Sequence, residues 1–323
     1  MIRFGKRFPL AVFLSLLMFV NACGSKEDSD TAGSKNPKIP CETKYPVLLV
    51  HGVGSRDNMF GVEYFGRIPQ YLTENCKIEV FFGGQDAFGM SDTNSQQLLQ
   101  TVLHITDDLG FEKVNIIAHS KGGLDSRFMF FLNKGKLING RTLNDRVSSL
   151  TTLSTPHRGS TLADYLFSKI SDKVENVLAL VLSAFGRLQG DSEQTDAKEA
   201  LDLLTHKTMG DWNAKMGDLE TGIDGVYSQS WSAIISGAIS DPVFKTTSEI
   251  MKKAGSPSND GAVDEPSAVY ANYRGSVGSG WIGGVSHMAI VDRAQVVTPG
   301  PTPGFDPRKF YQSILTELAT KGF

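Results

Sequence analysis

The segment from Val114 to Gly123 constrains the fold more than any other part of the sequence. An apolar run ends at Ala118, Ser120 follows, and two glycines, Gly122 and Gly123, come directly behind the serine. This pattern predicts a buried strand, a sharp turn at the serine and then a helix, because only small side chains fit two residues before and after a serine on such a turn. The alternative is an ordinary strand-to-helix turn. On the first interpretation, Ser120 is a candidate nucleophile.

Other apolar runs predict further strands, and helical patterns lie between them. One helix is expected to end at Gly110, and another to start at Asp306-Pro307 and end before Gly322. Strands that alternate with helices predict an α/β fold with a mostly parallel sheet covered by helices on both faces. The predicted strands cover residues 45–50, 77–82, 114–118, 148–153 and 226–235.

Residues 160–222 interrupt this alternation. They contain no clear strand, but they contain two or three helical segments, of which Val174 to Leu188 is the most apolar. Its apolar stripe is wider than a half-exposed helix needs. The segment is either a core helix or a helix that covers an apolar cleft. Because it is inserted between strands, we interpret 160–222 as a helical lid.

A serine hydroxyl needs a base to act as a nucleophile at neutral pH. The chain has six histidines, and in α/β hydrolases the base follows both the serine and the acid along the chain. That order leaves His157, His206 and His287, of which His287 lies in a glycine-rich loop after the last strand-like stretch. We therefore expect His287 to be the general base. His119 adjoins Ser120, and its side chain is expected to point away at the turn.

The base must be oriented by a carboxylate that follows a strand between Ser120 and His287. Asp260 lies on a predicted turn, between an asparagine and a glycine, and is the preferred candidate. Asp264 and Asp241 are the alternatives.

An oxyanion at the substrate carbonyl would need two backbone N–H donors. One is expected from Lys121, directly after the nucleophile. The other is expected from Val53, in the loop after the strand over 45–50, where Gly52 permits close approach of the backbone. The alternative for this loop is a simple glycine turn.

The N-terminus has the pattern of a targeting segment. A basic stretch within residues 1–7 precedes an uncharged, largely apolar stretch over 8–20. At about 1.5 Å per residue this stretch spans roughly 20 Å, less than the roughly 30 Å core of a bilayer. It is therefore interpreted as a signal peptide. Cys23 lies where a bacterial lipoprotein cleavage box places the lipidated cysteine, although signal cleavage without lipidation is the alternative.

The chain is therefore expected to divide into a signal peptide over 1–22, a flexible polar tether over 23–40 and one folded domain over 41–323. The tether lacks the apolar surface needed to fold. Export would bring the protein into an oxidising compartment, where Cys41 and Cys76 are expected to form a disulfide; two buried free thiols are the alternative. The net charge of −3 argues against a nucleic-acid partner.

Together these motifs resemble the bacterial true lipases of the pseudomonad type, which are triacylglycerol lipases with the α/β-hydrolase fold. The resemblance runs from about residue 43 to residue 292. It implies a triad of Ser120, Asp260 and His287, oxyanion donors at Val53 and Lys121, and the lid. The matching stretches are 45–52, 114–123, 154–160, 259–261 and 286–287.

The resemblance also implies a structural calcium held by two aspartates. Asp241 matches the first, but Ala289 stands where the second should follow His287 by two residues. A hard cation takes six or more oxygens, so no cofactor is expected. Asp292 could replace the missing carboxylate only by a different path. Some relatives need a folding helper, and such a partner is also considered for this chain.

The sequence thus predicts an exported serine carboxylester hydrolase of lipid esters that works through an acyl-enzyme, most simply a triacylglycerol lipase. The protein is expected either to be anchored by lipid to the bacterial cell envelope, most simply at the outer membrane, or to be secreted. An esterase or polyester depolymerase is the second interpretation, and a non-catalytic lipid-binding surface lipoprotein is the third.

Overall fold

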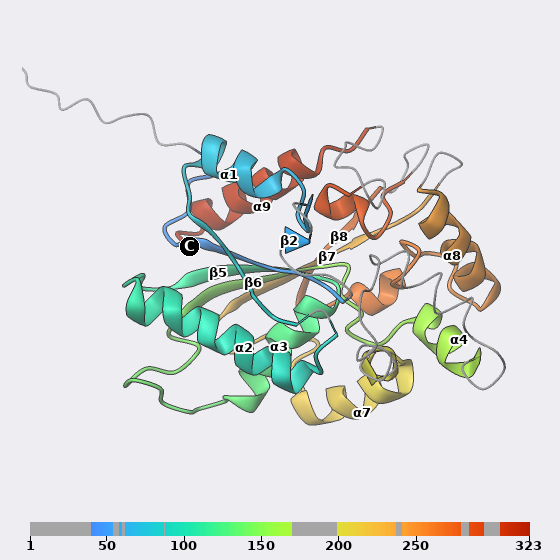
Figure 1. Cartoon of the computed structure of the whole chain (residues 1–323), viewed down its shortest axis with the longest axis horizontal. Coiled ribbons are helices and arrows are strands. Elements are labelled where there is room, and N and C mark those ends of the chain that lie inside the picture. Colours follow the sequence, from blue (N-terminus) through green and yellow to red (C-terminus); the bar gives the residue numbers. More distant parts are fainter. Residues whose placement is uncertain are drawn as a thin grey trace, which may run out of the picture. The chain divides into compact units, whose positions relative to one another are not determined.

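A six-stranded sheet forms the centre of the structure, which is a computed structural model. The structure describes residues 40–53, 58–59, 62–86, 88–169, 199–236, 241–278, 284–293 and 304–323. The strand order of this sheet is β4-β1-β5-β6-β7-β8, and each neighbouring pair is parallel (Figure 1). The strands are β1 Val47–Val50, β4 Val80–Phe82, β5 Val114–His119, β6 Val147–Leu153, β7 Tyr227–Ala233 and β8 Asn272–Val277. A separate short hairpin joins β2 Asn58–Met59 to β3 Val62–Glu63. The expected parallel α/β architecture is confirmed.

Helices cover both faces of this sheet. In Figure 1, α1 and α9 lie on one side of the sheet and α2 and α3 on the other. The longer helices are α1 Ile68–Cys76, α2 Ser91–Leu103, α3 Lys121–Leu132, α4 Thr161–Lys169, α7 His206–Met216, α8 Pro242–Lys253 and α9 Pro307–Thr320. The shorter helical turns are η1 His104–Asp108, η2 Glu265–Ala268 and η3 Ala289–Val291.

The alternation of side chains along β1 divides the core into two layers. Val47 and Leu49 pack with the apolar residues of α1 and α9, whereas Leu48 and Val50 pack with those of α2 and α3. Successive strand residues point to opposite faces, so both sets of side chains of β1 are buried. An uninterrupted apolar run such as β1 fits this position, because none of its side chains needs a hydrogen-bond partner.

Several local predictions are confirmed. The last helix, α9, starts after Asp306, whose side chain accepts a hydrogen bond from the backbone N–H of Arg308 as an N-cap. Gly110 has a φ of +82° where the helical segment formed by α2 and η1 ends. That segment passes from an α-helix into a π-helical turn, which the sequence pattern did not indicate.

The edge strand β8 was missed. Its sequence, from Asn272 to Val277, is polar, and its residues are only partly buried or exposed. An edge strand that is not covered on both faces does not need an apolar run, so the signal that identified the central strands was absent here.

The structure describes only part of the segment over 160–222. It shows α4, a helical stretch over 199–203 and α7, and no strand among the described residues of this segment. The apolar stretch from Val174 to Leu188 lies outside the described residues, so the lid stays a prediction. The same holds for the signal peptide, Cys23 and the tether up to residue 39. Within the described part of the chain, no helix is long and apolar enough to span a membrane.

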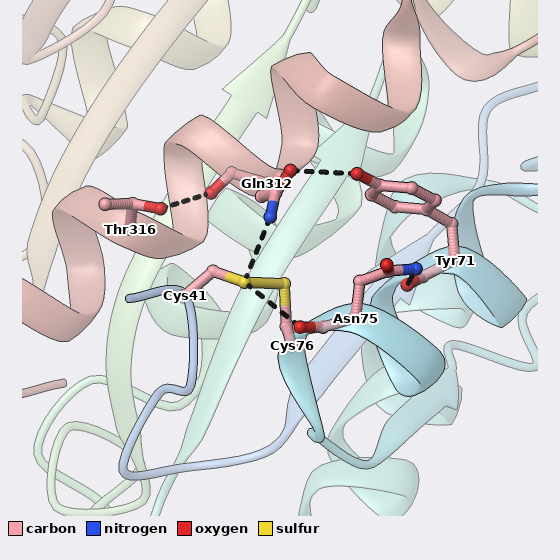
Figure 2. The surroundings of a disulfide bond; sticks show 6 residues. All are labelled: Cys41, Tyr71, Asn75, Cys76, Gln312 and Thr316. Atoms are coloured by element: carbon pink, nitrogen blue, oxygen red, sulfur yellow. Dashed lines mark hydrogen bonds between the residues drawn. A yellow bond between two sulfur atoms is a disulfide. The ribbon is translucent and has the colours of Figure 1, made fainter. Parts of the chain in front are cut away.

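A disulfide joins Cys41 to Cys76 (Figure 2). It ties the segment before β1 to the last residue of α1. Gln312 of α9 donates a hydrogen bond from Nε2 to Cys41 Sγ at 3.5 Å and accepts one from the Tyr71 hydroxyl at 2.9 Å. The bond and these contacts fasten α1 to α9, two helices that lie on the same face of the sheet.

Removing this disulfide should lower stability. The two cysteines are 35 residues apart, and opening a loop of this length should reduce the free energy of unfolding by about 3–4 kcal/mol. Urea unfolding of the wild type and of the Cys41→Ser/Cys76→Ser variant should give a lower midpoint for the variant. Equal midpoints for the wild type with and without reductant would contradict this expectation.

Candidate active site

Ser120 lies on a strained turn between β5 and α3. Its φ of 55° and ψ of −131° place a residue with a side chain in a region that glycine usually occupies. Such strain costs about 1–3 kcal/mol and needs support from the surrounding structure. Here the Ser120 N–H donates to the Leu153 carbonyl of β6 at 3.0 Å, and the Gly123 N–H donates to the Ser120 carbonyl at 3.0 Å.

The two glycines after the serine allow this turn to pack closely. A Cβ on Gly122 would lie 2.3 Å from the carbonyl oxygen of His51, just beyond β1. A Cβ on Gly123 would lie 2.2 Å from the hydroxyl oxygen of Thr155. Both positions therefore exclude any larger residue, and the first turn of α3 lies directly against the ends of β1 and β6.

The structure brings Ser120, His287 and Asp260 together. His287 Nε2 is 2.9 Å from Ser120 Oγ, and His287 Nδ1 is 2.8 Å from Asp260 Oδ2. The serine is 3% exposed, the aspartate 1% and the histidine 0%. Because a carboxylate oxygen accepts hydrogen bonds, Nδ1 donates to Asp260, and when the ring carries only that proton Nε2 accepts from the serine hydroxyl.

Backbone groups hold the aspartate in place. Asp260 Oδ1 accepts hydrogen bonds from the N–H groups of Ala262 at 2.9 Å and Val263 at 2.8 Å. The Asp260 carbonyl also accepts from the backbone N–H of His287 at 2.9 Å. The loop that carries the acid and the loop that carries the imidazole are therefore joined through both backbone and side chain.

The alternative acids are engaged elsewhere. Asp264 accepts hydrogen bonds from the backbone N–H and the hydroxyl of Thr161, at the start of α4. Asp241 caps α8 by accepting from the N–H groups of Val243 and Phe244.

The alternative histidines are also engaged elsewhere. Nε2 of His157 lies 2.9 Å from the Thr152 hydroxyl, and its ring stacks on Tyr270. His206 pairs with Asp164 at 2.6 Å, where both side chains are partly exposed. Of the candidates considered, the structure brings only His287 to Ser120.

The expectation for His119 is wrong. Its ring does not point away from the site, because its centroid lies 4.5 Å from that of His287. The reason is Tyr64, a buried residue whose hydroxyl lies 2.6 Å from His119 Nδ1. Burial, and secondarily the nearby His287, lower the pKa of His119 well below its ordinary value. A buried hydrogen bond therefore joins the Tyr64 hydroxyl to Nδ1 of a neutral His119. Tyr64 belongs to none of the sequence motifs, and no pattern in the sequence indicated that it lies next to the site.

The two residues considered as oxyanion donors belong to segments that pass close to Ser120. Lys121 is the first residue of α3, where helix N–H groups have no partner within the helix. Val53 follows Gly52, at which a Cβ would lie 2.8 Å from Ser120 Cβ and 3.3 Å from Ser120 Oγ. The side chain of Lys121 is buried and pairs with Asp125 at 2.8 Å, one turn further along α3.

Comparison with known proteins supports the resemblance to bacterial lipases. No family model matches the chain. A curated triacylglycerol lipase of Pseudarthrobacter phenanthrenivorans is 31% identical over 193 residues, which are 57% of this chain and 57% of that lipase. One of Pseudomonas fragi is 29% identical over 214 residues, 61% of this chain and 69% of that protein. The chain thus spans little more than half the length of the first of these relatives. The resemblance that the motifs predicted is confirmed.

A solved structure gives the fold. The lipase of Staphylococcus hyicus superposes with a TM-score of 0.60 at 17% identity, over 89% of this chain and 99% of that one. This chain has the α/β-hydrolase fold. The predicted fold class is therefore confirmed, apart from the lid. Ser120 lies on a sharp strand-to-helix turn, the kind of turn that carries a nucleophilic serine in α/β hydrolases.

The residues present do not fit the calcium site of the lipases that this α/β hydrolase resembles. Ala289 supplies no carboxylate, and both oxygens of Asp292 are hydrogen-bonded to Arg67. Asp241 remains, with one buried oxygen, Oδ2, that has no hydrogen-bond partner in the part of the chain that the structure describes. The described residues also contain no group of three or more metal-binding side chains. One carboxylate is too few for a cation that takes six or more oxygens.

The buried Asp241 carboxylate, whose Oδ2 has no hydrogen-bond partner among the described residues, should make stability depend on pH. Burial raises the pKa of Asp241, so its contribution to stability is present below the pKa of the unfolded chain and is lost as the pH rises through the folded-state value. The Asp241→Asn variant keeps the capping oxygen and cannot ionise. It should melt at a higher temperature than the wild type at pH 7–8, and this difference should vanish near pH 4.

Melting with EDTA and with added calcium is the control. We expect neither to change the melting temperature of the wild type or of Asp241→Asn. If calcium stabilises the wild type but not the variant, Asp241 is a metal ligand and this interpretation is wrong.

Proposed function

We propose that this chain is a serine hydrolase that cleaves carboxylic esters of lipids, with Ser120 as nucleophile, His287 as general base and acid, and Asp260 as the group that orients the imidazole. The observation that carries this proposal is the unbroken series of hydrogen bonds from the Ser120 hydroxyl through His287 to Asp260. The names of the curated relatives support lipid esters, and triacylglycerol in particular, as the substrate.

In the first half of the reaction, Ser120 Oγ attacks the ester carbonyl carbon while its proton passes to His287 Nε2. The new C–O bond gives a tetrahedral intermediate with a negative charge on the former carbonyl oxygen. His287 then gives its proton to the alcohol oxygen as the bond between that oxygen and the carbon breaks. The alcohol leaves, and the acyl group stays on Ser120.

In the second half, a water molecule takes the place of the alcohol. His287 Nε2 removes a proton from the water as its oxygen attacks the acyl carbon. Collapse of the second intermediate breaks the bond to Ser120 Oγ, which recovers its proton from the imidazolium. The fatty acid leaves, and the enzyme returns to its starting state.

Asp260 and the two backbone donors act on the charges that form in these steps. The carboxylate of Asp260 stabilises the positive imidazolium and keeps the proton on Nδ1. The N–H groups of Val53 and Lys121 would bind the oxyanion, and a donor of this kind contributes about 10²–10³-fold to the rate. Backbone donors of this kind need no reorganisation during the reaction, because the fold sets their direction before substrate binds.

The Ser120→Ala variant should lose nearly all turnover while keeping its fold. Removal of one member of a triad typically costs about 10⁴- to 10⁶-fold in kcat. Hydrolysis of p-nitrophenyl esters and labelling by a fluorophosphonate probe should both disappear. The matched control is Ser168→Ala, an exposed serine on α4, which should behave as the wild type. Activity retained by Ser120→Ala would refute the assignment.

Substrate chain length separates the lipase from the second candidate. We expect hydrolysis of emulsified triglyceride and of long-chain p-nitrophenyl esters. Activity confined to short chains would favour an esterase, and activity on polymeric esters would favour a polyester depolymerase. If the wild type neither hydrolyses any ester nor reacts with the fluorophosphonate, a non-catalytic lipid-binding protein is the better interpretation.

A further inference from the structure

We propose that the ion pair between Arg67 and Asp292 positions His287 for catalysis. The proposal rests on the function proposed above for His287. Arg67 and Asp292 are positioning residues, because neither contacts Ser120 or the reacting atoms.

Three hydrogen bonds join the two residues. The backbone N–H of Arg67 donates to Asp292 Oδ2 at 2.8 Å, its Nε donates to the same oxygen at 2.8 Å, and its Nη2 donates to Oδ1 at 2.7 Å. The Asp292 side chain is fully buried, whereas that of Arg67 is 39% exposed. A buried carboxylate with a two-pronged guanidinium partner is a strong, directional contact, and its loss would leave the carboxylate without a countercharge.

The aspartate terminates the short segment that carries the imidazole. This segment is tightly folded on itself: the Ala289 N–H donates to the Ser286 carbonyl at 3.0 Å, and the Arg293 N–H donates to the Met288 carbonyl at 2.9 Å. A turn of 3₁₀ helix, η3, fills the space between. His287 lies only five residues before Asp292 in this tightly folded segment, so a shift of Asp292 would also move His287.

Asp292 ends η3 in a left-handed backbone conformation, and Gly66 packs closely against it. Its φ is +64°, a conformation that residues with side chains seldom adopt. Gly66 packs against it so closely that a Cβ there would lie 2.8 Å from Asp292 Oδ2 and 2.9 Å from its carbonyl oxygen. Gly66 also has a positive φ, of +51°. The turn over 66–67 is thus shaped to fit the carboxylate.

Arg67 is carried by a rigid element. It is the residue directly before α1. At its other end α1 is held by the disulfide at Cys76, and along its side Tyr71 of α1 donates a hydrogen bond to Gln312 of α9 (Figure 2). The ion pair therefore connects the layer formed by α1 and α9 to the segment of His287. Asp260 restrains the same segment near the imidazole, so that His287 is held from two places.

The decisive variant is Asp292→Asn, which keeps the shape of the side chain but removes its negative charge. It also replaces one acceptor oxygen by an NH2 group, which cannot accept a hydrogen bond from the Arg67 guanidinium. A displacement of about 1 Å can lower a rate about 10²-fold. We expect kcat for ester hydrolysis to fall by about 10- to 100-fold with KM within about 2-fold, because the substrate does not contact this pair. The rate of fluorophosphonate labelling should fall in parallel.

Two variants of the arginine test the geometry of the pair. Arg67→Lys keeps the positive charge but cannot make the two parallel hydrogen bonds of a guanidinium. Arg67→Gln loses both the charge and this paired contact. We expect kcat to be highest in the wild type, lower in Arg67→Lys and lowest in Arg67→Gln. Wild-type kcat in Asp292→Asn and in both arginine variants would overturn the proposal.

Asp306→Asn is the matched control. Asp306 binds Arg308 through the same three donors, the backbone N–H at 3.0 Å, Nε at 3.0 Å and Nη2 at 2.9 Å. Both ends of that pair belong to the first turn of α9, so it joins no loop of the active site to the sheet. This variant should keep wild-type kcat. An equal loss of kcat in Asp306→Asn and Asp292→Asn would mean a general effect on stability and would overturn the positioning role.

Hydrogen exchange gives a readout that does not need activity. Peptides that cover residues 284–293 should exchange faster in Asp292→Asn than in the wild type and in Asp306→Asn. If the wild type hydrolyses no ester and the probe does not react, the proposed function fails, while the exchange rates still report whether Asp292 holds the segment. If the wild type is active and exchange in Asp292→Asn is unchanged, the proposed function stands and the positioning role fails.

Discussion

The strained turn at Ser120 is the constraint on which the rest of the structure depends. A positive φ at a residue with a side chain is unfavourable by about 1–3 kcal/mol, and it persists here because the turn is packed on both sides. Gly122 lies against the end of β1, Gly123 lies against Thr155, and the Ser120 N–H is bonded to β6. The central strands must lie side by side in the observed order for these contacts to exist, so the turn and the sheet stabilise each other.

Around this turn, separate loops each contribute one group, and each loop is held by its own contacts. Backbone N–H groups donate hydrogen bonds to Asp260, and the Asp260 carbonyl accepts one from the backbone N–H of His287. At the far end of that segment, Arg67 donates hydrogen bonds to Asp292. The polar groups are therefore arranged before any substrate is bound. An arrangement fixed during folding does not have to be created again in each turnover, which is the physical basis of electrostatic preorganisation.

How well the sequence predicted each feature depends on the range of the interaction behind it. The central strands, α9 and the turn at Ser120 follow from local patterns, namely apolar runs, an N-cap with proline, and glycines after a serine. The edge strand β8 was missed because a partly exposed strand needs no apolar run. The orientation of His119 was wrong because it depends on Tyr64, which comes from a distant segment and belongs to no motif.

The sequence by itself determined the parallel α/β fold and named Ser120, Asp260 and His287 as candidates, since chain order and local turn chemistry restrict the choice. Only the tertiary structure decided that these three side chains meet, that Asp264 and His157 are engaged elsewhere, and that Arg67 occupies both oxygens of Asp292. The reason is that such pairs join residues far apart in the chain, and their distances are set by how the strands and helices pack, which no local pattern encodes.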